Sequence, residues 1–274
     1  MLKLKAFAKI NLSLKILGTR QDSYHELESV MQSVTLFDTL TLTPIDSGIE
    51  VITTNLQLPT NNKNLAYKAA EEFFRVQGVG SSGIKIYIEK QIPVGAGLAG
   101  GSADAAAVLV GLNNIYGKKL SQEELMVVGA KIGSDVPFCI MGGNCTVKGR
   151  GERVTRNTLN ETRNYLLVIP EVEVSTKWAY DAWDESQMKN EKCKMKNEGS
   201  KNDLESVVIK KYPVIQKVKD RMLELGCTFA QMSGSGSSVF GFPADDKKLR
   251  EIRKEYGRSY YVETADSGVE IFSV

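Results

Sequence analysis

The chain has 274 residues, of which 42% are hydrophobic and 25% are charged, and its formal net charge is +2. These values are typical of a globular protein with one large or two smaller domains, and they do not indicate nucleic acid as the main partner. The sequence contains no apolar run of the ~20 residues that cross a bilayer, and its four cysteines lack zinc-site spacing, so we expect a soluble cytoplasmic protein with reduced thiols.

Hydrophobic periodicity divides the chain into two halves. In the first half it predicts strands over residues 2–17, 34–43, 49–54 and 84–89, and helices over 64–77, 105–112 and 123–132. In the second half it predicts strands over 165–169, 227–232, 238–242, 260–264 and 269–274, and helices over 204–211, 213–225 and 245–255. This order indicates an α+β fold with an N-terminal domain over 1–155 and a C-terminal domain over 156–274. The polar segment 187–202 lacks apolar periodicity, so we expect a solvated loop or a partly disordered segment there.

A glycine-rich turn between the strand at 84–89 and the helix at 105–112 is the most informative local feature. Four glycines and Ser102 lie between Pro93 and that helix. Because glycine adopts positive φ and has no Cβ, successive N–H groups can converge on an anion, and the helix N-terminus adds its positive dipole. Pro93 interrupts the approach that a dinucleotide-binding turn requires, and no Walker lysine follows the glycines. The turn therefore predicts a phosphate site, with a glycine-rich turn that binds nothing as the alternative.

Polar residues elsewhere each have two interpretations. On the strand at 2–17, Lys9 and Asn11 share a polar face, which on this segment alone is typical of a solvated strand surface. Asp135 could cap a short helix, and His25 could be a hydrogen-bonded structural histidine. The segment 231–238, rich in glycine and serine, could be a mobile hairpin between two strands. In isolation, none of these residues predicts a catalytic site.

Together these segments resemble one family over nearly the whole chain, the small-metabolite kinases that include galactokinase, homoserine kinase, mevalonate kinase and phosphomevalonate kinase. The family's central motif, Pro-x-x-x-Gly-Leu-x-x-(Gly)-Ser-(Ser/Ala), is similar to Pro93–Ala103. Its N-terminal motif is similar to Lys9–Leu12 and its C-terminal glycine motif to Ser233–Ser238. The segment Gly18–Leu27 resembles the Arg-x-Asp-Gly-Tyr-His-x-Leu element of members that act on a cytidine diphosphate-linked sugar alcohol, with Ser23 in place of the usual glycine.

The resemblance implies both a fold and a chemistry. The implied fold has an N-terminal domain of the ribosomal protein S5 domain 2 type, a C-terminal ferredoxin-like domain and an active site between them. The implied activity is ATP-dependent phosphorylation of a hydroxyl of that sugar alcohol. Asp135 would orient or deprotonate the hydroxyl, and Lys9 would stabilise the developing alkoxide. Another kinase of the family, such as homoserine or mevalonate kinase, and a non-catalytic nucleotide-binding regulator are the alternatives.

The same resemblance assigns residues to each ligand. ATP and a bridging magnesium ion would contact the glycine-rich turn, namely Pro93, Val94, Gly95, Ala96, Gly97, Leu98, Ala99, Gly100, Gly101, Ser102 and Ala103. The adenine side would involve Asn64 and Leu65. The small-molecule substrate would contact Asn11, Tyr24, His25, Ser175, Thr176 and Tyr180, with Trp178 as the alternative ring that stacks on cytosine. No nucleic-acid or membrane partner is expected, and the sequence assigns neither protein ligands for magnesium nor an oligomeric state.

Overall fold

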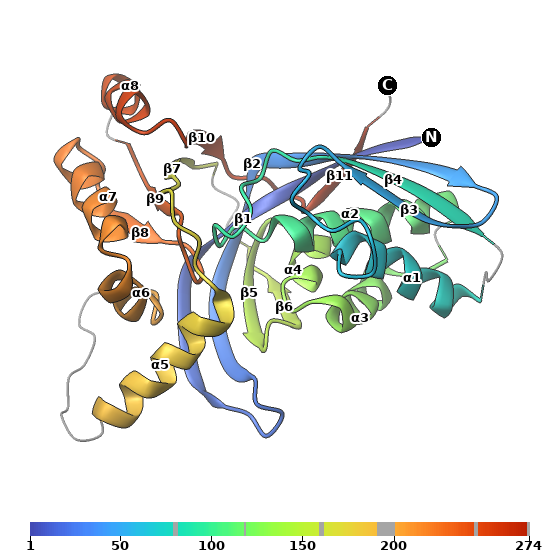
Figure 1. Ribbon diagram of the computed structural model, residues 1–274, viewed down its shortest axis with the longest axis horizontal. Coiled ribbons are helices and arrows are strands. Elements are labelled where there is room, and N and C mark those ends of the chain that lie inside the picture. Colours follow the sequence, from blue (N-terminus) through green and yellow to red (C-terminus); the bar gives the residue numbers. More distant parts are fainter. Residues whose placement is uncertain (79–81, 118, 159–161, 191–200, 244–245, 273–274) are drawn as a thin grey trace.

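The computed structural model describes residues 1–78, 82–117, 119–158, 162–190, 201–243 and 246–272, which form two sheets with helices packed against them (Figure 1). The larger sheet contains seven strands: β1 (Leu2–Thr19), β2 (His25–Ile45), β3 (Gly48–Thr53), β4 (Gly83–Glu89), β5 (Asn144–Gly149), β6 (Arg153–Arg156) and β11 (Val269–Phe272). Their order is β11-β1-β2-β4-β3, with β5 paired to β2 and to β6. Only β3 and β4 are paired in parallel among these strands.

Four helices lie together on one face of this sheet (Figure 1). They are α1 (Leu65–Gln77), α2 (Gly100–Ile115), α3 (Gln122–Ile132) and α4 (Val136–Met141). Helix α2 is central because its run of alanines and other small residues is buried on nearly every side. Ser121 caps α3 in a capping box, which the sequence Ser121-Gln122-Glu123-Glu124 indicates, and its side chain accepts from the Glu124 amide.

The smaller sheet is antiparallel and has the order β10-β7-β9-β8. Its strands are β7 (Asn164–Val168), β8 (Ala230–Met232), β9 (Val239–Gly241) and β10 (Ser259–Glu263). The helices of this half are α5 (Thr176–Asn190), α6 (Glu205–Lys211), α7 (Pro213–Glu224) and α8 (Asp246–Glu255). Helix α5 lies along the long β1–β2 hairpin, so the two halves of the molecule meet there (Figure 1).

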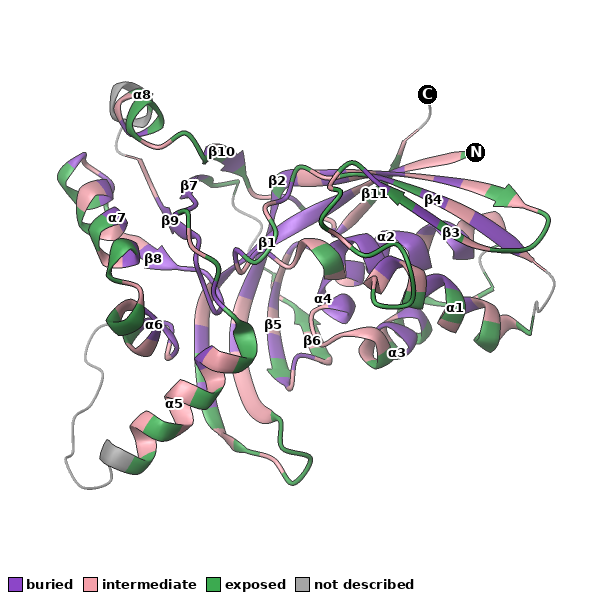
Figure 2. Cartoon of the chain, viewed as in Figure 1, coloured by how far each residue is buried: buried purple, intermediate pink, exposed green. Residues whose placement is uncertain are grey.

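Strand β1 contributes to both hydrophobic cores. Its first part places Leu4 and Ile10 in the core under α1–α4, whereas Leu14 and Ile16 belong to the core formed with α6 and α7. Figure 2 shows that the buried positions continue along β1 from one half to the other. The strand therefore carries the residues around Asn11 through the seam between the halves.

Most of the predicted elements are present within a few residues of their expected ends, but some were missed, α4 was offered only as an alternative for Asp135, and one segment was misread at its ends. The sequence pattern did not predict β5, β6 or α5, and β2 begins at His25 instead of near residue 34. The segment 187–202 was expected to be a solvated loop or a partly disordered segment, but at its two ends residues 187–190 belong to α5 and Asn202 is buried. Residues 191–200 lie outside the described part of the chain.

The chain returns to the larger sheet at its C-terminal end. Strand β11 pairs with β1 in antiparallel register, with Lys3 opposite Phe272 and Ala6 opposite Val269. The domain boundary between residues 155 and 156 stays a prediction. Strand β11 lies beyond that boundary in the sequence but belongs to the sheet of the N-terminal domain.

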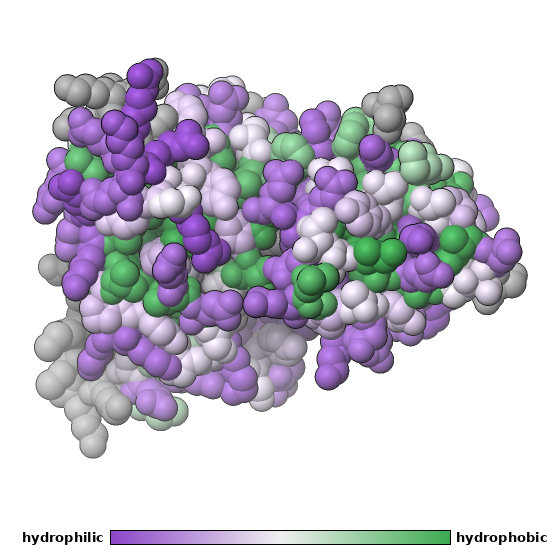
Figure 3. Space-filling model, turned by 45° about the horizontal axis from the view of Figure 1, so that its top comes forward, coloured by the Kyte–Doolittle hydropathy of each residue, from purple (hydrophilic) through white to green (hydrophobic). Residues whose placement is uncertain are grey.

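The surface is mainly hydrophilic on the face shown in Figure 3, where hydrophobic side chains form separate patches. Among the described residues, no helix is long and apolar enough to span a membrane.

Candidate active site

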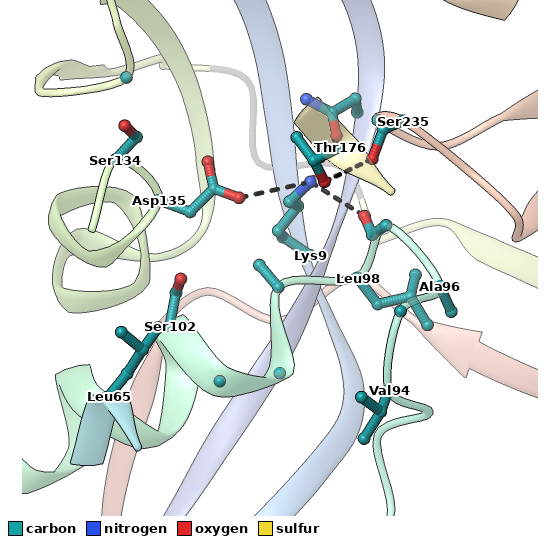
Figure 4. A pocket seen from close by; sticks show the side chains of 18 of the residues that line it. Lys9, Leu65, Val94, Ala96, Leu98, Ser102, Ser134, Asp135, Thr176 and Ser235 are labelled. Carbon is teal, nitrogen blue, oxygen red and sulfur yellow. Dashed lines mark hydrogen bonds and ion pairs between the residues drawn. The ribbon is translucent and has the colours of Figure 1, made fainter. Parts of the chain in front are cut away.

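A cavity of about 890 Å³ lies at the seam between the two halves. Its walls come from β1, the glycine-rich turn, the loop before α4, the start of α5 and the loop after β8 (Figure 4). All the residues that the sequence assigned to ATP, substrate or catalysis line this cavity except Ala103 and Ser175. Segments that are far apart in the sequence therefore converge on one space, whose volume is in the range typical of small-molecule sites.

The glycine-rich turn has the backbone that an anion site requires. Gly95 and Gly97 have φ of 67° and 74°, and Ala99, at the N-cap of α2, also has a left-handed φ of 58°. No side chain caps α2 at this end. The first amides of a 16-residue helix thus remain available beside the cavity, where they and the helix dipole favour a phosphate.

Three glycines of the turn differ in the space around the position of a Cβ atom. A Cβ on Gly97 would lie 2.3 Å from the Ser233 carbonyl oxygen, and one on Gly100 would lie 3.0 Å from Ile92 Cγ2. A Cβ on Gly101 would meet only Leu65 Cδ1, at 3.6 Å. Gly97 is therefore required by close packing against backbone and Gly100 is tightly packed against the Ile92 side chain, whereas Gly101 leaves open space toward the cavity.

Lys9 is the central charged group of the cavity. Its Nζ donates to Asn11 Oδ1 at 2.6 Å and to the Gly97 carbonyl at 2.9 Å, and it lies 3.7 Å from Asp135 Oδ2 (Figure 4). Lys9 and Asn11 are 4% and 1% exposed. The simpler interpretation of this strand face as a solvated surface is therefore wrong, and the structure brings Lys9 and Asp135 together from positions 126 residues apart.

Asp135 occupies the N-cap position of α4, but its side chain makes no capping hydrogen bond. The carboxylate, 31% exposed, instead faces Lys9 and the cavity (Figure 4). Burial and the Asp135 charge together raise the pKa of the Tyr180 hydroxyl on the opposite wall. Asp135 thus presents an accessible carboxylate to the cavity beside Lys9, which is the position that a general base needs.

The loop after β8 connects β8 to β9 as a hairpin, and hydrogen bonds hold it on both sides, which favours an ordered loop over a mobile one. Ser233 Oγ accepts from the Asn11 amide at 3.1 Å and lies 3.2 Å from the Gly97 carbonyl, to which it donates. Asn202 Nδ2 donates to the carbonyls of Met232 and Gly234 at 2.9 and 2.8 Å. The sequence pattern singled out this loop but assigned no site residue to it, although two of its residues, Gly234 and Ser235, line the cavity.

The tip of the β1–β2 hairpin and α5 form the far end of the cavity. Tyr24 is 50% exposed, and the Arg150 guanidinium lies 5.1 Å from the centre of its ring. Tyr180 lines the cavity, whereas Trp178 packs edge-on against Tyr212 at 5.6 Å and is not among the lining residues. Of the two rings that the sequence offered for stacking, the cavity contains Tyr180.

A buried ion cluster supports the glycine-rich turn and was not predicted. Lys90 contacts Asp38 and lies 2.6 Å from Asp104, and Asp38 accepts from the Ile92 amide at 2.8 Å. Burial raises the pKa of Asp104 to about 7, against the opposing charge of Lys90. Burial alone would lower the pKa of Lys90, but Asp104 and Asp38 raise it. The cluster ties β2, the glycine-rich turn and α2 together.

Several assigned or neighbouring residues have local structural roles. Asn64 lines the cavity beside Leu65, but its Oδ1 caps α1 by accepting from the Ala66 amide. Ser175 Oγ accepts from the Trp178 amide at the start of α5, and Ala103 is buried in the core. Cavity residues missed in the sequence include Lys63, Lys90, Ser134, Arg150 and Ser235. Ser134 and Arg150 each lie next to glycines, in Gly133-Ser134-Asp135 and Gly149-Arg150-Gly151, which was the only local signal.

Two family models match the chain, GHMP kinases N terminal domain over residues 64–143 and GHMP kinases C terminal over residues 188–262. The 4-diphosphocytidyl-2-C-methyl-D-erythritol kinase of Clostridium acetobutylicum is 39% identical over 280 residues, which cover 96% of this chain and 100% of that relative. The kinase of the same name from Caldicellulosiruptor saccharolyticus is 44% identical over 256 residues, or 88% of each chain.

Solved structures agree with these relatives. A 4-(cytidine 5'-diphospho)-2C-methyl-D-erythritol kinase matches with a TM-score of 0.79 at 30% identity, covering 96% of this chain and 99% of that one. Homoserine kinase from Cytophaga hutchinsonii matches with a TM-score of 0.74 at 19% identity over 99% of this chain and 97% of that one, a likeness of fold alone. The expected two-domain fold is confirmed. The chain belongs to the GHMP kinase family, and within it to the 4-diphosphocytidyl-2-C-methyl-D-erythritol kinases.

Proposed function

We propose that the protein transfers the γ-phosphoryl group of ATP to the 2-hydroxyl of 4-diphosphocytidyl-2-C-methyl-D-erythritol, a step in making isoprenoid precursors by the non-mevalonate route. The names of the relatives support the reaction. The observation that carries it is the Lys9–Asp135 pair, which lies in one cavity between an uncapped helix N-terminus and an aromatic end. Homoserine and mevalonate contain no nucleobase, so a kinase for either would have no ligand for the Tyr24–His25 element.

Asp135 acts as the base in this proposal. Its carboxylate accepts the proton of the acceptor hydroxyl as that oxygen attacks the γ-phosphorus. Lys9 holds positive charge beside the developing alkoxide, and its contacts with Asn11 and the Gly97 carbonyl keep the ammonium in place before substrate arrives. Both residues thus work by position and charge, which is what phosphoryl transfer mainly requires.

The ATP phosphates fit against the start of α2, where the uncapped amides and Gly101 border the cavity. Among the described residues, no three His, Cys, Asp or Glu side chains gather to form a metal cage. Asp104 is held by Lys90, so the protein oxygen that fits a nucleotide-bound magnesium ion is the Ser102 hydroxyl. Magnesium, when bound with ATP, would supply neutralising charge on the phosphates.

The substrate lies across the seam in this proposal. Asn11 and Thr176 contact its sugar-alcohol part near Lys9, and its cytosine reaches the end of the cavity formed by Tyr24, His25 and Tyr180. A stacked base is stabilised by about 1–3 kcal/mol per ring in nucleic-acid complexes, which is enough to anchor the nucleotide end of the substrate.

The proposal is tested by coupled measurement of ADP formation with the cytidyl substrate, with homoserine, with mevalonate and without acceptor. We expect ADP formation with the cytidyl substrate and none with homoserine, with mevalonate or without acceptor. Asp135→Asn should lower kcat by about 10²-fold or more with little change in ATP affinity, as expected for loss of a general base. Asp220→Asn, on an exposed position of α7, removes the same charge elsewhere and serves as the control. Turnover of homoserine or mevalonate, or full activity of Asp135→Asn, would refute the assignment.

A further inference from the structure

His25 is the only histidine of the chain, and three side chains hold its ring. Its Nε2 lies 2.9 Å from Asp184 Oδ1. One face of the imidazole stacks on Tyr180, with centroids 4.8 Å apart and planes at 28°, and Trp183 meets the ring edge-on at 5.9 Å. The His25 side chain is only 11% exposed, so these contacts define its position.

The three partners form one surface of α5. Tyr180, Trp183 and Asp184 are spaced as i, i+3 and i+4, which places them on the same side of a helix. His25 comes from the first residue of β2, on a different segment of the fold. Helix α5 packs along the hairpin (Figure 1). This packing brings two rings and one carboxylate onto a single imidazole.

The hydrogen bond to Asp184 has a definite direction. An ionised carboxylate can only accept, so the shared proton must be on His25 Nε2. A neutral imidazole carries one N–H, and the other ring nitrogen then has a free lone pair. With Nε2 engaged by Asp184, the polar atom that His25 can offer to a ligand in the cavity is Nδ1, as an acceptor.

We propose that Asp184 is a positioning residue for base specificity, which fixes His25 as the Nε2–H tautomer and makes Nδ1 an acceptor for the amino group of cytosine. The proposal rests on the proposed function of the cavity. Cytosine presents an amino donor at the position where uracil presents a carbonyl acceptor. An acceptor on His25 pairs with the cytosine amino group, whereas the uracil carbonyl would face another lone pair. The opposite tautomer would reverse this preference, so the carboxylate on α5 decides which pyrimidine is read.

The single histidine makes the tautomer directly measurable. In protein purified without a histidine tag and labelled with ¹⁵N-histidine, a long-range ¹H–¹⁵N spectrum contains the signals of one imidazole. Recorded over a range of pH in the absence of substrate, it should show the neutral ring of the wild type as the Nε2–H form alone. In Asp184→Ala the signals should shift to the average of both tautomers. A wild-type ring in the Nδ1–H form, or an Asp184→Ala spectrum identical to wild type, would overturn the proposal.

Kinetics with the cytidyl substrate and its uridine analogue provide the functional measurement. Asp184→Ala should raise KM for the cytidyl substrate roughly tenfold, the loss expected for one hydrogen bond, and should reduce the preference for cytidine over uridine. We expect kcat to change little, because the variant leaves Lys9 and Asp135 in place. Glu185→Gln removes a charge from the next, exposed residue of α5 and should leave KM and the spectrum as in wild type.

The two measurements separate the possible failures. An unchanged cytidine preference in Asp184→Ala, despite a changed tautomer, would overturn the role in specificity. If the wild type shows the expected tautomer but does not phosphorylate the cytidyl substrate, the proposed function fails, and the assignment of cytosine as the ligand of Nδ1 fails with it.

Discussion

Adding one methyl group at Gly97 or at Gly101 should separate the structural role of the glycine-rich turn from its role in binding ATP. At Gly97 the new Cβ would lie 2.3 Å from the Ser233 carbonyl oxygen, and the residue would keep a φ of 74°. The left-handed backbone alone costs about 1–2 kcal/mol for an L residue. Backbone atoms must also shift to relieve the overlap, so we expect Gly97→Ala to lower the free energy of unfolding by about 3 kcal/mol or more.

Gly101→Ala adds the same atom at a position with room for it. Its Cβ would meet only Leu65 Cδ1 at 3.6 Å, an ordinary contact, and alanine at a helical position gains up to about 1 kcal/mol over glycine. The protein should therefore be as stable as wild type or slightly more so. Gly101→Val, which extends further into the cavity, should displace a phosphate from the α2 amides. Loss of one hydrogen bond to a charged group corresponds to roughly a tenfold to hundredfold weaker ATP affinity.

Denaturant unfolding and calorimetric titration with ATP measure the two effects on the same variants. The expected pattern is a stable Gly101→Val with weak ATP binding and normal affinity for the cytidyl substrate, beside a destabilised Gly97→Ala. Wild-type ATP affinity in Gly101→Val would show that the phosphates do not lie over this end of α2. A Gly97→Ala variant as stable as wild type would refute the packing argument.

Three further outcomes are expected. Burial raises the pKa of Asp104 to about 7 in the folded protein, whereas the unfolded chain releases this proton near the ordinary pKa of 3.8, so the free energy of unfolding should fall as pH rises through that window. The slope is at most about 1.4 kcal/mol per pH unit, and Asp104→Asn should flatten it in denaturant titrations at pH 5 and 7. Lys9→Ala should lower kcat by about 10²-fold with little change in ATP affinity, and near wild-type turnover at saturating substrates would remove Lys9 from the mechanism. His25→Ala should raise KM for the cytidyl substrate and leave KM for ATP unchanged. If KM for ATP changes instead, the cytosine of the substrate does not bind at His25.

Local sequence pattern was sufficient where an element's own residues determine its structure. The alternation of β1 and the capping box at Ser121 are examples, because side-chain period and caps depend only on neighbours in sequence. Helix α5 was missed because its apolar stripe is narrow and is completed by packing against the distant hairpin, where Tyr180 meets His25. Asn202 was misread for a similar reason, since its hydrogen bonds to Met232 and Gly234 carbonyls come from another part of the chain.

The site could be predicted only in part. The glycine-rich turn is a continuous motif and was found directly, whereas Lys9 and Asp135 were joined only through the family resemblance. Asp38 and Asp104 lie 52 and 14 residues from Lys90, and no local pattern connects the three. Tertiary contact between charges at such separations is created by the fold, so it becomes visible only in the structure.

One departure from the family pattern corresponds to a particular backbone position. Ser23, which stands where the family element has glycine, has a φ of 66°, and Ala99 is the other non-glycine residue with positive φ in the described part of the chain, at 58°. Each is expected to cost about 1–2 kcal/mol of strain. The turn at Ser23 is closed by a hydrogen bond that the Arg20 amide donates to the Tyr24 carbonyl at 2.7 Å. Both positions therefore carry backbone strain that a glycine would avoid.

The contacts of Lys9 tie the proposed catalytic pair to both halves of the molecule. A buried ammonium needs compensation, and at 3.7 Å the Asp135 carboxylate provides only part of it. The Gly97 carbonyl, which accepts from Lys9, also accepts from Ser233 of the C-terminal half, and Ser233 in turn accepts from the Asn11 amide. The Lys9 ammonium, which we propose stabilises the reacting oxygen, is thus held by both halves at once. Correct packing of the two halves is therefore a condition for orienting the lysine, and disruption of the Gly97–Ser233 contact should reduce activity even where ATP still binds.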